Sequence, residues 1–427
     1  MRVLLFRSLC DTGGVSSWMQ EHGRELVRAG AEPHFWFCKD SARFPEFHAI
    51  GPATIGDMPT LVRAIESNAY DVVHVSSSDA AAEILQSIEP RPKIVASNRG
   101  ALSRHWNSGD CFARTAVSRA MAEYDQPRTD LLVEPVLNGV DANRFSPPES
   151  IGGGSPIVAW VGRTTDLRSK DFPRFTRIAS LLAGSGVRLW VADAHGANWS
   201  RFESPPCARV DFERWERVAH ADMPAFYRAV TESGGVVVMT STTEGFGWVA
   251  VEAAACGAGT IAPAVAGLRE TVLDGVTGTL FQPTASDAEV AALVRGWIGN
   301  GAAGKAAVAR RVEAVRASFS LSGMTSSYLE VYGRPNQLRA PAPRPSPDRD
   351  EPTLGVLLGQ AAWRRPFQAR EILDGLRLLL DAGRTDLASR AFGRLVRRYP
   401  GHLLRGESGR RARRVALRLL ARRLRGR

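Results

Sequence analysis

The residues of this sequence that most clearly suggest chemistry lie in and after a glycine-rich turn, in residues 241–253 (STTEGFGWVAVEA). We expect an apolar strand to end at Met239 and a helix to begin near Gly247. Such a turn offers free backbone N–H groups and the positive end of a helix dipole, which suit a phosphate group. The glycines of such a turn let a ligand approach the backbone closely. A tight turn that simply requires glycine is the alternative interpretation.

Two glutamates flank this turn at a spacing of eight residues. A carboxylate accepts hydrogen bonds from two directions and therefore binds vicinal hydroxyls well. Glu252 would lie about 12 Å beyond Glu244, at roughly 1.5 Å per helical residue. The pair is thus better interpreted as two separate hydroxyl sites than as one acid–base pair, and hydroxyls together with phosphates indicate a nucleotide sugar. The alternative for Glu252 is a solvated charge on a helix surface.

A second candidate segment is residues 159–172 (AWVGRTTDLRSKDF), in which a predicted strand is followed by Gly162 and two cations. Arg163 and Lys170 could neutralise a diphosphate and stabilise the negative charge that develops on a leaving group. Arg168 is a competing candidate. Solvated loop charges are the structural alternative.

The first predicted strand is followed by a third glycine-rich loop, which contains Gly13 and Gly14. The loop does not have the G-x-G-x-x-G spacing, and no acidic residue at a strand end completes a dinucleotide fingerprint. The sequence therefore argues against a nicotinamide-dependent dehydrogenase.

Composition excludes several further classes of protein. The chain has 427 residues, of which 44% are hydrophobic and 23% charged, as expected for a folded protein of two or three domains. Its five cysteines are scattered without a C-x-x-C pair, which indicates neither a disulfide framework nor a metal site. The first residues (MRVLLFRSLC) lack the apolar length of a secretory signal, and we expect a cytoplasmic protein.

The order of the predicted elements indicates an α/β fold. Short apolar strands alternate with helices up to about residue 147, and the alternation restarts after the glycine-rich residues 146–156. Strands that are apolar on both faces form parallel sheets covered by helices. We predict two Rossmann-like domains (1–147 and 152–318) that face a cleft, a closing helix (319–334), a proline-rich linker (335–353) and a separate helical appendage (354–427).

The ordered motifs resemble those of a family 4 retaining glycosyltransferase with the GT-B fold. The similarity covers roughly residues 1–333. Its motifs are the Gly13-Gly14-Val15 loop, LNGVDANRF (137–145), Gly162-Arg163 with Lys170, EGFGWVAVE (244–252) with its Glu, seven residues, Glu pattern, and GLRETVLDGVTGTLF (267–281).

The resemblance implies roles for these residues. Glu244 would contact hydroxyls of the transferred sugar and Glu252 the ribose, while Arg163 and Lys170 would bind the diphosphate. Gly245, Phe246 and Gly247 would supply backbone contacts, and Gly13 and Gly14 would let donor and acceptor meet in the cleft. No metal or other cofactor is expected, and the expected partners are a nucleotide sugar and a cell-envelope, polysaccharide or lipid-linked acceptor.

One departure from the family concerns a histidine that many members carry near the transferred sugar. In this sequence Asn98 or Arg99 stands about where that histidine would be. Neither His105 nor His74 is a clean replacement, and a structural role is expected for both. The role usually given to the histidine is therefore unassigned.

The basic character of the chain resides in its C-terminal part. Residues 354–427 contain 19 arginines, no lysine and five acids, whereas the net charge of the whole chain is +11. As a helix, residues 405–427 would present Leu417, Leu420 and Leu424 on one side among arginines, which suits an anionic membrane surface. A solvated helix end is the alternative, and nucleic acid is not expected because no aromatic residues are interleaved.

Two alternative functions remain open from the sequence. A nucleotide-sugar epimerase could use the same two-domain architecture. A non-catalytic nucleotide-sugar sensor or scaffold could use the helical tail to recruit partners.

Overall fold

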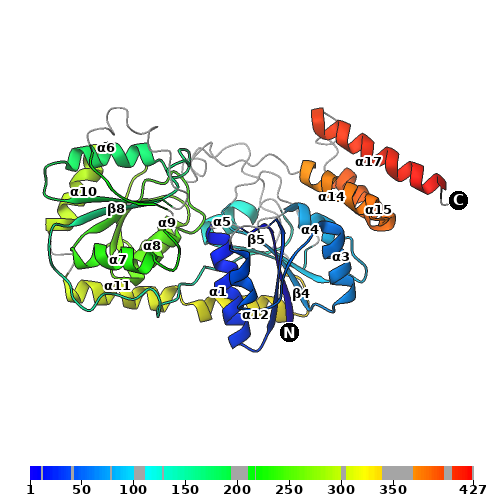
Figure 1. The fold of residues 1–427 in the computed structure, drawn as a ribbon, viewed down its shortest axis with the longest axis horizontal. Coiled ribbons are helices and arrows are strands. Elements are labelled where there is room, and N and C mark those ends of the chain that lie inside the picture. Colours follow the sequence, from blue (N-terminus) through cyan, green and yellow to red (C-terminus); the bar gives the residue numbers. More distant parts are fainter. Residues whose placement is uncertain are drawn as a thin grey trace.

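The structure is a computed structural model that describes most of the chain. The described residues are 1–10, 13–39, 43–76, 79–100, 111–126, 129–193, 210–216, 218–299, 304–338, 369–398 and 406–425. Figure 1 shows two α/β domains side by side and a group of C-terminal helices against the first of them.

The N-terminal domain is built on a parallel sheet of seven strands in the order β3-β2-β1-β4-β5-β6-β7. The strands are β1 Arg2–Leu9, β2 Glu32–Lys39, β3 Ala53–Ile55, β4 Val72–Ser76, β5 Lys93–Asn98, β6 Ala113–Ala116 and β7 Val133–Pro135. The helices between them are α1 Gly14–Arg28, α2 Phe44–His48, α3 Met58–Ser67, α4 Asp79–Leu85 and α5 Arg119–Asp125.

Helices cover both faces of this sheet. Since alternate residues of a strand point to opposite sides, each strand contributes side chains to both cores. Val3 and Leu5 of β1 belong to the apolar core that contains α1. Leu4 and Phe6 belong to the core on the other face, which contains α3 and α4. The continuous apolar run at the start of the chain is explained by these two cores.

The C-terminal domain repeats this design with a parallel sheet of six strands in the order β10-β9-β8-β11-β12-β13. Its strands are β8 Ile157–Gly162, β9 Arg188–Asp193, β10 Glu213–Glu216, β11 Val236–Val238, β12 Gly259–Pro263 and β13 Gly278–Phe281. Its helices are α6 Phe172–Leu182, α7 Met223–Glu232, α8 Trp248–Ala255, α9 Leu268–Thr271, α10 Asp287–Gly299 and α11 Lys305–Ser318. Val158 and Trp160 pack with α6 and α10, whereas Ile157 and Ala159 pack with α7 and α8.

After α11 the chain returns to the N-terminal domain through α12 Leu321–Gly333, which lies beside α1 (Figure 1). Tyr328 and Tyr332 of α12 are buried in the core around α1, together with Trp18. The return of the chain therefore ties the C-terminal domain to the first sheet at a second point.

Three C-terminal helices follow: α14 Ala369–Asp381, α15 Thr385–Arg398 and α17 Gly406–Arg425. Helices α14 and α15 pack on the N-terminal domain, and α17 packs on α14 and α15. Leucines of α14 at helical spacing, among them Leu373, Leu376 and Leu380, are buried in one core with Leu61 of α3 and Ile84 of α4. A Cβ atom at Gly375 would lie only 2.6 Å from Ile84 Cδ1, so α14 and α4 approach closely.

The sequence-based prediction of a separate appendage is therefore wrong, although its helical character is confirmed. The outer faces of α3 and α4 are apolar and are covered by α14 and α15. Ion pairs between Arg384 and Glu66 add a charged contact at the edge, with the two closest atoms 2.6 Å apart.

The two-domain α/β fold with its C-terminal helices is confirmed. The predicted linker lies mostly outside the described residues, as does His105. Among the residues that the structure describes, no helix combines the length and apolar character needed to cross a bilayer.

Packing of the appendage generates a first prediction. Leu376→Ala should destabilise the shared core by about 2–5 kcal/mol, because it leaves a cavity at a buried position. Hydrogen exchange followed by mass spectrometry should then show faster exchange in α3 and α4 as well as in α14. Leu417→Ala is the matched control, since Leu417 is exposed. Faster exchange restricted to the appendage would contradict the shared core.

Candidate active site

A cavity of about 860 Å³ lies between the two domains, at the carboxyl ends of both sheets. In open parallel α/β sheets this is the edge where ligands bind. The competing candidate Arg168 does not line it, whereas the ten residues predicted to bind the donor all do: Gly13, Gly14, Gly162, Arg163, Lys170, Glu244, Gly245, Phe246, Gly247 and Glu252. The structure thus brings the predicted residues together, while their roles remain predictions.

The helix α8 directs its N-terminus into this cavity. Its N-cap, Gly247, has φ of 100°, and a Cβ there would lie 2.6 Å from Leu268 Cδ2, so only glycine fits. No described side chain caps the helix. The N–H groups of its first turn are therefore available for an anion, and the helix dipole favours one.

Glu244 and Lys170 contact each other across the cavity wall. Lys170 Nζ donates to Glu244 Oε1, which also accepts a hydrogen bond of 3.0 Å from Ser241 Oγ. The segment before α6 is fixed to the segment before α8 by backbone contacts, including Thr242 N to Ser169 O at 2.9 Å. A cation and a carboxylate from two different loops are thus held at adjacent positions.

Arg163 lies at the carboxyl end of β8 and is held by Asp166 at 2.9 Å. Burial raises the pKa of the Asp166 carboxyl, but hydrogen bonds from Ser169 and Arg163 outweigh this effect and keep the pKa below its ordinary value. Asp166 therefore stays charged, which orients the guanidinium while leaving it partly exposed to the cavity.

Glu252 is a buried carboxylate, with 5% of its surface exposed, and not a solvated charge on a helix. His220 Nε2 lies 2.7 Å from Glu252 Oε1, and Tyr227 Oη donates to Oε2 at 3.1 Å. Burial, with Glu252 beside it, holds the pKa of Tyr227 well above its ordinary value. Two acceptor positions of the carboxylate are used in this way, and a carboxylate has about four.

His220 connects Glu252 to the other domain. Arg144 donates to His220 Nδ1 at 3.2 Å and forms an ion pair of 3.1 Å with Glu21 of α1. Because arginine can only donate, Nδ1 of His220 is the acceptor and Nε2 carries the proton that Glu252 accepts. A continuous polar chain thus crosses the cavity from α1 to α8.

The wall from the N-terminal domain approaches α8 closely. Gly14 lies at the start of α1, and a Cβ there would be 3.7 Å from Trp248 Cδ1. A Cβ at Gly245 would be 2.5 Å from the Cα atom of Gly100. The backbones of the two domains therefore touch beside Glu244, and this contact excludes any side chain at position 245.

Arg99 follows β5 and lines the cavity, whereas its neighbour Asn98 does not. The Arg99 guanidinium stacks on Trp18 at 3.1 Å and donates to Asn138 Oδ1 at 3.0 Å and to Tyr328 Oη at 2.8 Å. Burial lowers the pKa of Arg99, but a guanidinium remains charged at neutral pH. Arg99 is thus a fixed cation and not a stand-in for a basic histidine. Asn98 donates to Asp125 at 2.7 Å.

His74 is part of a buried polar cluster, as its predicted structural role requires. Its ring nitrogens contact Tyr332 Oη and Ser97 Oγ. His22 contacts Thr325 and Tyr332 of α12, each at 3.0 Å. Burial, reinforced by the charge of Arg99, holds the pKa of both histidines well below the ordinary value near 6.5.

Among the cavity residues, His220 and Asp193 were missed from the sequence, whereas Arg144 belongs to the LNGVDANRF motif but was given no role. Asp193 ends β9 and accepts a hydrogen bond from Thr164. His220 follows β10, a strand whose charged sequence (ERWE) gave no apolar run. Their position after a strand at the carboxyl edge was the signal available.

Among the described residues, no three His, Cys, Asp or Glu side chains gather closely enough to hold a metal ion. Metal independence stays a prediction.

Part of the chain matches a known family of enzymes. Residues 215–311 match the family model of group 1 glycosyl transferases, and this region contains both glutamates. D-inositol 3-phosphate glycosyltransferases of Mycobacterium bovis (strain BCG / Pasteur 1173P2) and Mycobacterium tuberculosis (strain ATCC 25618 / H37Rv) are each 36% identical over 167 residues. The alignment covers 35% of this chain and 32% of each relative, so the chain spans about a third of their length.

Solved structures match over most of the chain. Alr3699/HepE of Anabaena in complex with UDP-glucose has a TM-score of 0.62 at 18% identity, covering 77% of this chain and 98% of that one. A sucrose-phosphate synthase from Thermosynechococcus elongatus has a TM-score of 0.62 at 18% identity, covering 78% and 98%. At this level of identity the likeness concerns the fold, which is the GT-B arrangement of two Rossmann-like domains.

The buried histidines generate a prediction on pH. Below about pH 6.5 an unfolded histidine takes up a proton that His22 and His74 do not take up in the fold. Stability should therefore fall as pH decreases from 6.5, by up to about 1.4 kcal/mol per pH unit for each histidine. Thermal unfolding at pH 7.5, 6.5 and 5.5 would measure the decline. The variant His22→Gln/His74→Gln should show a shallower decline, and an equally steep one would contradict the assignment.

Proposed function

We propose that this protein is a retaining glycosyltransferase of family 4, which moves a sugar from a nucleotide-diphosphate sugar to a cell-envelope, polysaccharide or lipid-linked acceptor. The observation that carries the proposal is one cavity between the domains that combines an uncapped helix N-terminus, two cations and two carboxylates about two helical turns apart. The match to the group 1 family over 215–311 supports transfer rather than epimerisation or sensing.

The contact between Lys170 and Glu244 supports this interpretation. In a nucleotide sugar, the bond that breaks joins C1 of the sugar to a phosphate oxygen. A residue that holds sugar hydroxyls and a residue that neutralises the phosphate must therefore be neighbours. Glu244 and Lys170 are neighbours in the cavity, and the N-terminus of α8 begins three residues after Glu244.

Charge development explains why cations belong here. As the acceptor oxygen bonds to C1 and loses its proton, the electron pair of the breaking bond passes to the phosphate oxygen. Lys170, Arg163 and the N–H groups at the start of α8 would stabilise that negative charge. Three positively polarised groups around one diphosphate make a bound metal unnecessary in this proposal.

Glu252 would bind the ribose of the nucleotide. Its carboxylate retains acceptor capacity beside His220 and Tyr227, and it lines the same cavity farther along α8. The polar chain through Arg144 then connects the ribose site to α1, so that the two domains hold the nucleotide site together.

The roles of the two glutamates predict different kinetic effects. Glu244→Gln should lower turnover by about 100-fold or more, the size seen when one stabilising contact to the reacting centre is lost. Glu252→Gln should mainly weaken nucleotide binding, by about tenfold or more, as expected for a charged hydrogen bond. Glutamine is preferred to alanine because Tyr227 can turn its hydroxyl to accept from the new amide.

The experiment begins with thermal shift over a panel of nucleotide sugars and continues with transfer assays. Glu313→Gln, on the exposed face of α11, is the matched control and should behave as the unmodified protein. No stabilisation by any nucleotide sugar would overturn the proposal. Binding without transfer or hydrolysis would favour a sensor, and equal nucleotide affinity of Glu252→Gln would refute the ribose role.

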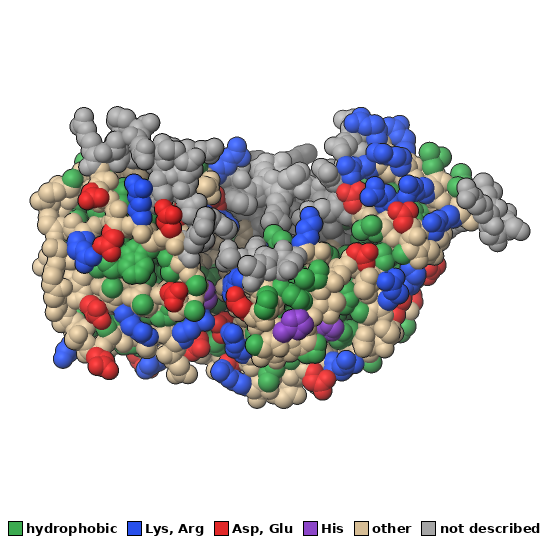
Figure 2. Space-filling model, viewed as in Figure 1, with side chains coloured by type: hydrophobic (Ala, Val, Ile, Leu, Met, Phe, Trp, Pro, Cys, Tyr) green, Lys and Arg blue, Asp and Glu red, His purple; other side chains and the backbone are tan. Residues whose placement is uncertain are grey.

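We also propose that α17 docks on the anionic inner membrane face. The helix buries Ala412, Val415 and Leu419 against the other appendage helices. Leu417 and Leu420 lie on the outer side, with 65% and 56% of their surface exposed. Arg413 and Arg414 are exposed on the same helix, and Figure 2 shows a gathering of Lys and Arg side chains over the C-terminal helices.

The exposed stripe predicts a membrane-binding defect. Leu417→Ser/Leu420→Ser should weaken sedimentation with phosphatidylglycerol vesicles by about tenfold or more, because each buried leucine contributes about 1.5–3 kcal/mol. Leu181→Ser, at an exposed leucine of α6, is the control. Equal sedimentation of the unmodified protein, the double variant and the control would contradict the proposal. A truncation would be a poorer test, because it would also uncover α3 and α4.

A further inference from the structure

A second cavity, of about 540 Å³, lies between α15 and the turn that connects α4 to β5. It is formed by residues 86–91 on one side and residues 385–397 on the other. The turn precedes β5, whereas the cavity between the domains lies after the carboxyl end of β5. Six residues of a strand span about 20 Å, so the two cavities are separate sites.

Four arginines and two acids line this second cavity. Arg390 Nε donates to Ser87 O at 3.0 Å, and Arg394 donates to Gln86 Oε1 at 2.6 Å. These two contacts fasten α15 to the N-terminal domain. One of the acids, Asp386, already pairs with Arg384 at 3.8 Å and with Arg390 at 3.4 Å.

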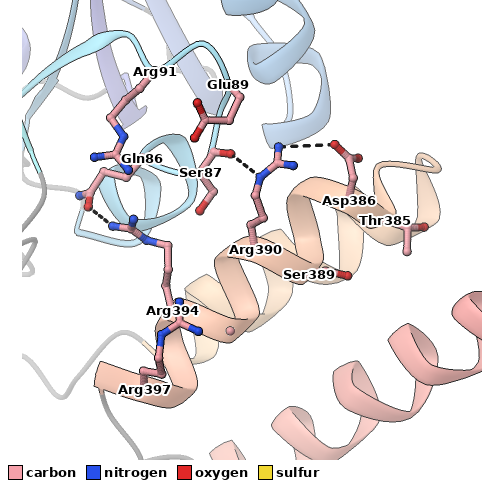
Figure 3. A pocket seen from close by; sticks show the side chains of 11 residues that line it. Gln86, Ser87, Glu89, Arg91, Thr385, Asp386, Ser389, Arg390, Arg394 and Arg397 are labelled. Carbon is pink, nitrogen blue, oxygen red and sulfur yellow. Dashed lines mark hydrogen bonds and ion pairs between the residues drawn. The ribbon is translucent and has the colours of Figure 1, made fainter.

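The other two arginines, Arg91 and Arg397, have neither an ion pair nor a hydrogen bond with any described residue. They come from opposite sides of the cavity, one from the turn and one from α15. Figure 3 shows the guanidinium groups of Arg91 and Arg394 beside Gln86, that of Arg397 farther along α15, and the Glu89 carboxylate above Ser87. Three like charges in one concave site repel one another and create a local positive potential.

We infer that this cavity binds a phosphate group, held by Arg91 from the N-terminal domain and by Arg394 and Arg397 from α15. The planar fork of arginine matches phosphate oxygens through paired hydrogen bonds, and the ligand charge removes the repulsion between the guanidinium groups. The phosphate would bridge the appendage and the N-terminal domain. Its source is either the headgroup of an anionic lipid or a soluble phosphate ester.

The test uses the full-length protein, inorganic pyrophosphate as the probe and hydrogen exchange with mass spectrometry as the readout. Pyrophosphate should protect peptides that cover residues 86–91 and 385–397. In the double variant Arg91→Gln/Arg397→Gln, the pyrophosphate concentration that gives half of the maximal protection should rise by about tenfold or more, since charged hydrogen bonds are lost. Arg310→Gln/Arg316→Gln makes the same charge change on the exposed surface of α11 and should leave it unchanged.

Hydrogen exchange is measured for each peptide separately. Pyrophosphate bound in the cleft between the domains would protect peptides that cover residues 244–256, and this signal is distinct from protection of the second cavity. The inference would be overturned if pyrophosphate did not protect residues 86–91 and 385–397 of the unmodified protein. It would also be overturned if Arg91→Gln/Arg397→Gln and the control variant needed the same pyrophosphate concentration for half-maximal protection. Phosphatidylglycerol vesicles then identify the source. Weaker vesicle binding of Arg91→Gln/Arg397→Gln indicates a lipid headgroup, whereas unchanged vesicle binding with loss of pyrophosphate protection indicates a soluble phosphate ester.

Discussion

The two domains meet where the backbones of Gly100 and Gly245 touch, and the shape of the cleft depends on this contact. A single methyl group at position 245 would lie 2.5 Å from the Cα atom of Gly100. Glu244 and the start of α8 flank the contact on one side, and Arg99 flanks it on the other. A small displacement here would therefore move the carboxylate, the helix N-terminus and the fixed cation relative to one another.

Other interactions hold the domains at this separation. The chain of contacts from Glu21 through Arg144 and His220 to Glu252 crosses the cavity, and α12 returns to the first sheet, where it packs against α1. The polar contacts between α1 and α12 are buried, which makes their geometry specific because an unpaired partner would be costly, whereas Arg144 and His220 are partly exposed to the cavity. The ribose carboxylate proposed at Glu252 is thus oriented by residues of the opposite domain.

The sequence predicted the parts of the fold that rest on local patterns. Strands β1, β4 and β8 are apolar on both faces, and α6 and α10 bury apolar residues at helical spacing, so their type and approximate bounds could be read directly. The edge strands β3 and β10 were missed because they are short or charged and are stabilised by pairing with a neighbour.

The same distinction separates the site residues that could be found from those that could not. Glycine-rich turns after strands, with carboxylates or cations beside them, led to all ten predicted residues, which line one cavity. His220 was missed along with β10, and Arg144 was found only as part of the 137–145 motif, because its partners His220 and Glu21 lie far away in sequence. The docking of α14 on α4 was equally inaccessible, since an amphipathic pattern identifies an apolar face but not its partner.

We propose above all that the diphosphate of a nucleotide sugar binds at the N-terminus of α8, between Arg163 and Lys170. The most direct measurement is a crystal structure of the full chain with the nucleotide sugar that stabilises it most. We expect phosphate oxygens within hydrogen-bonding distance of the first-turn N–H groups of α8, of Arg163 and of Lys170, with the ribose at Glu252. A nucleotide bound elsewhere, with these groups facing solvent, would contradict the account.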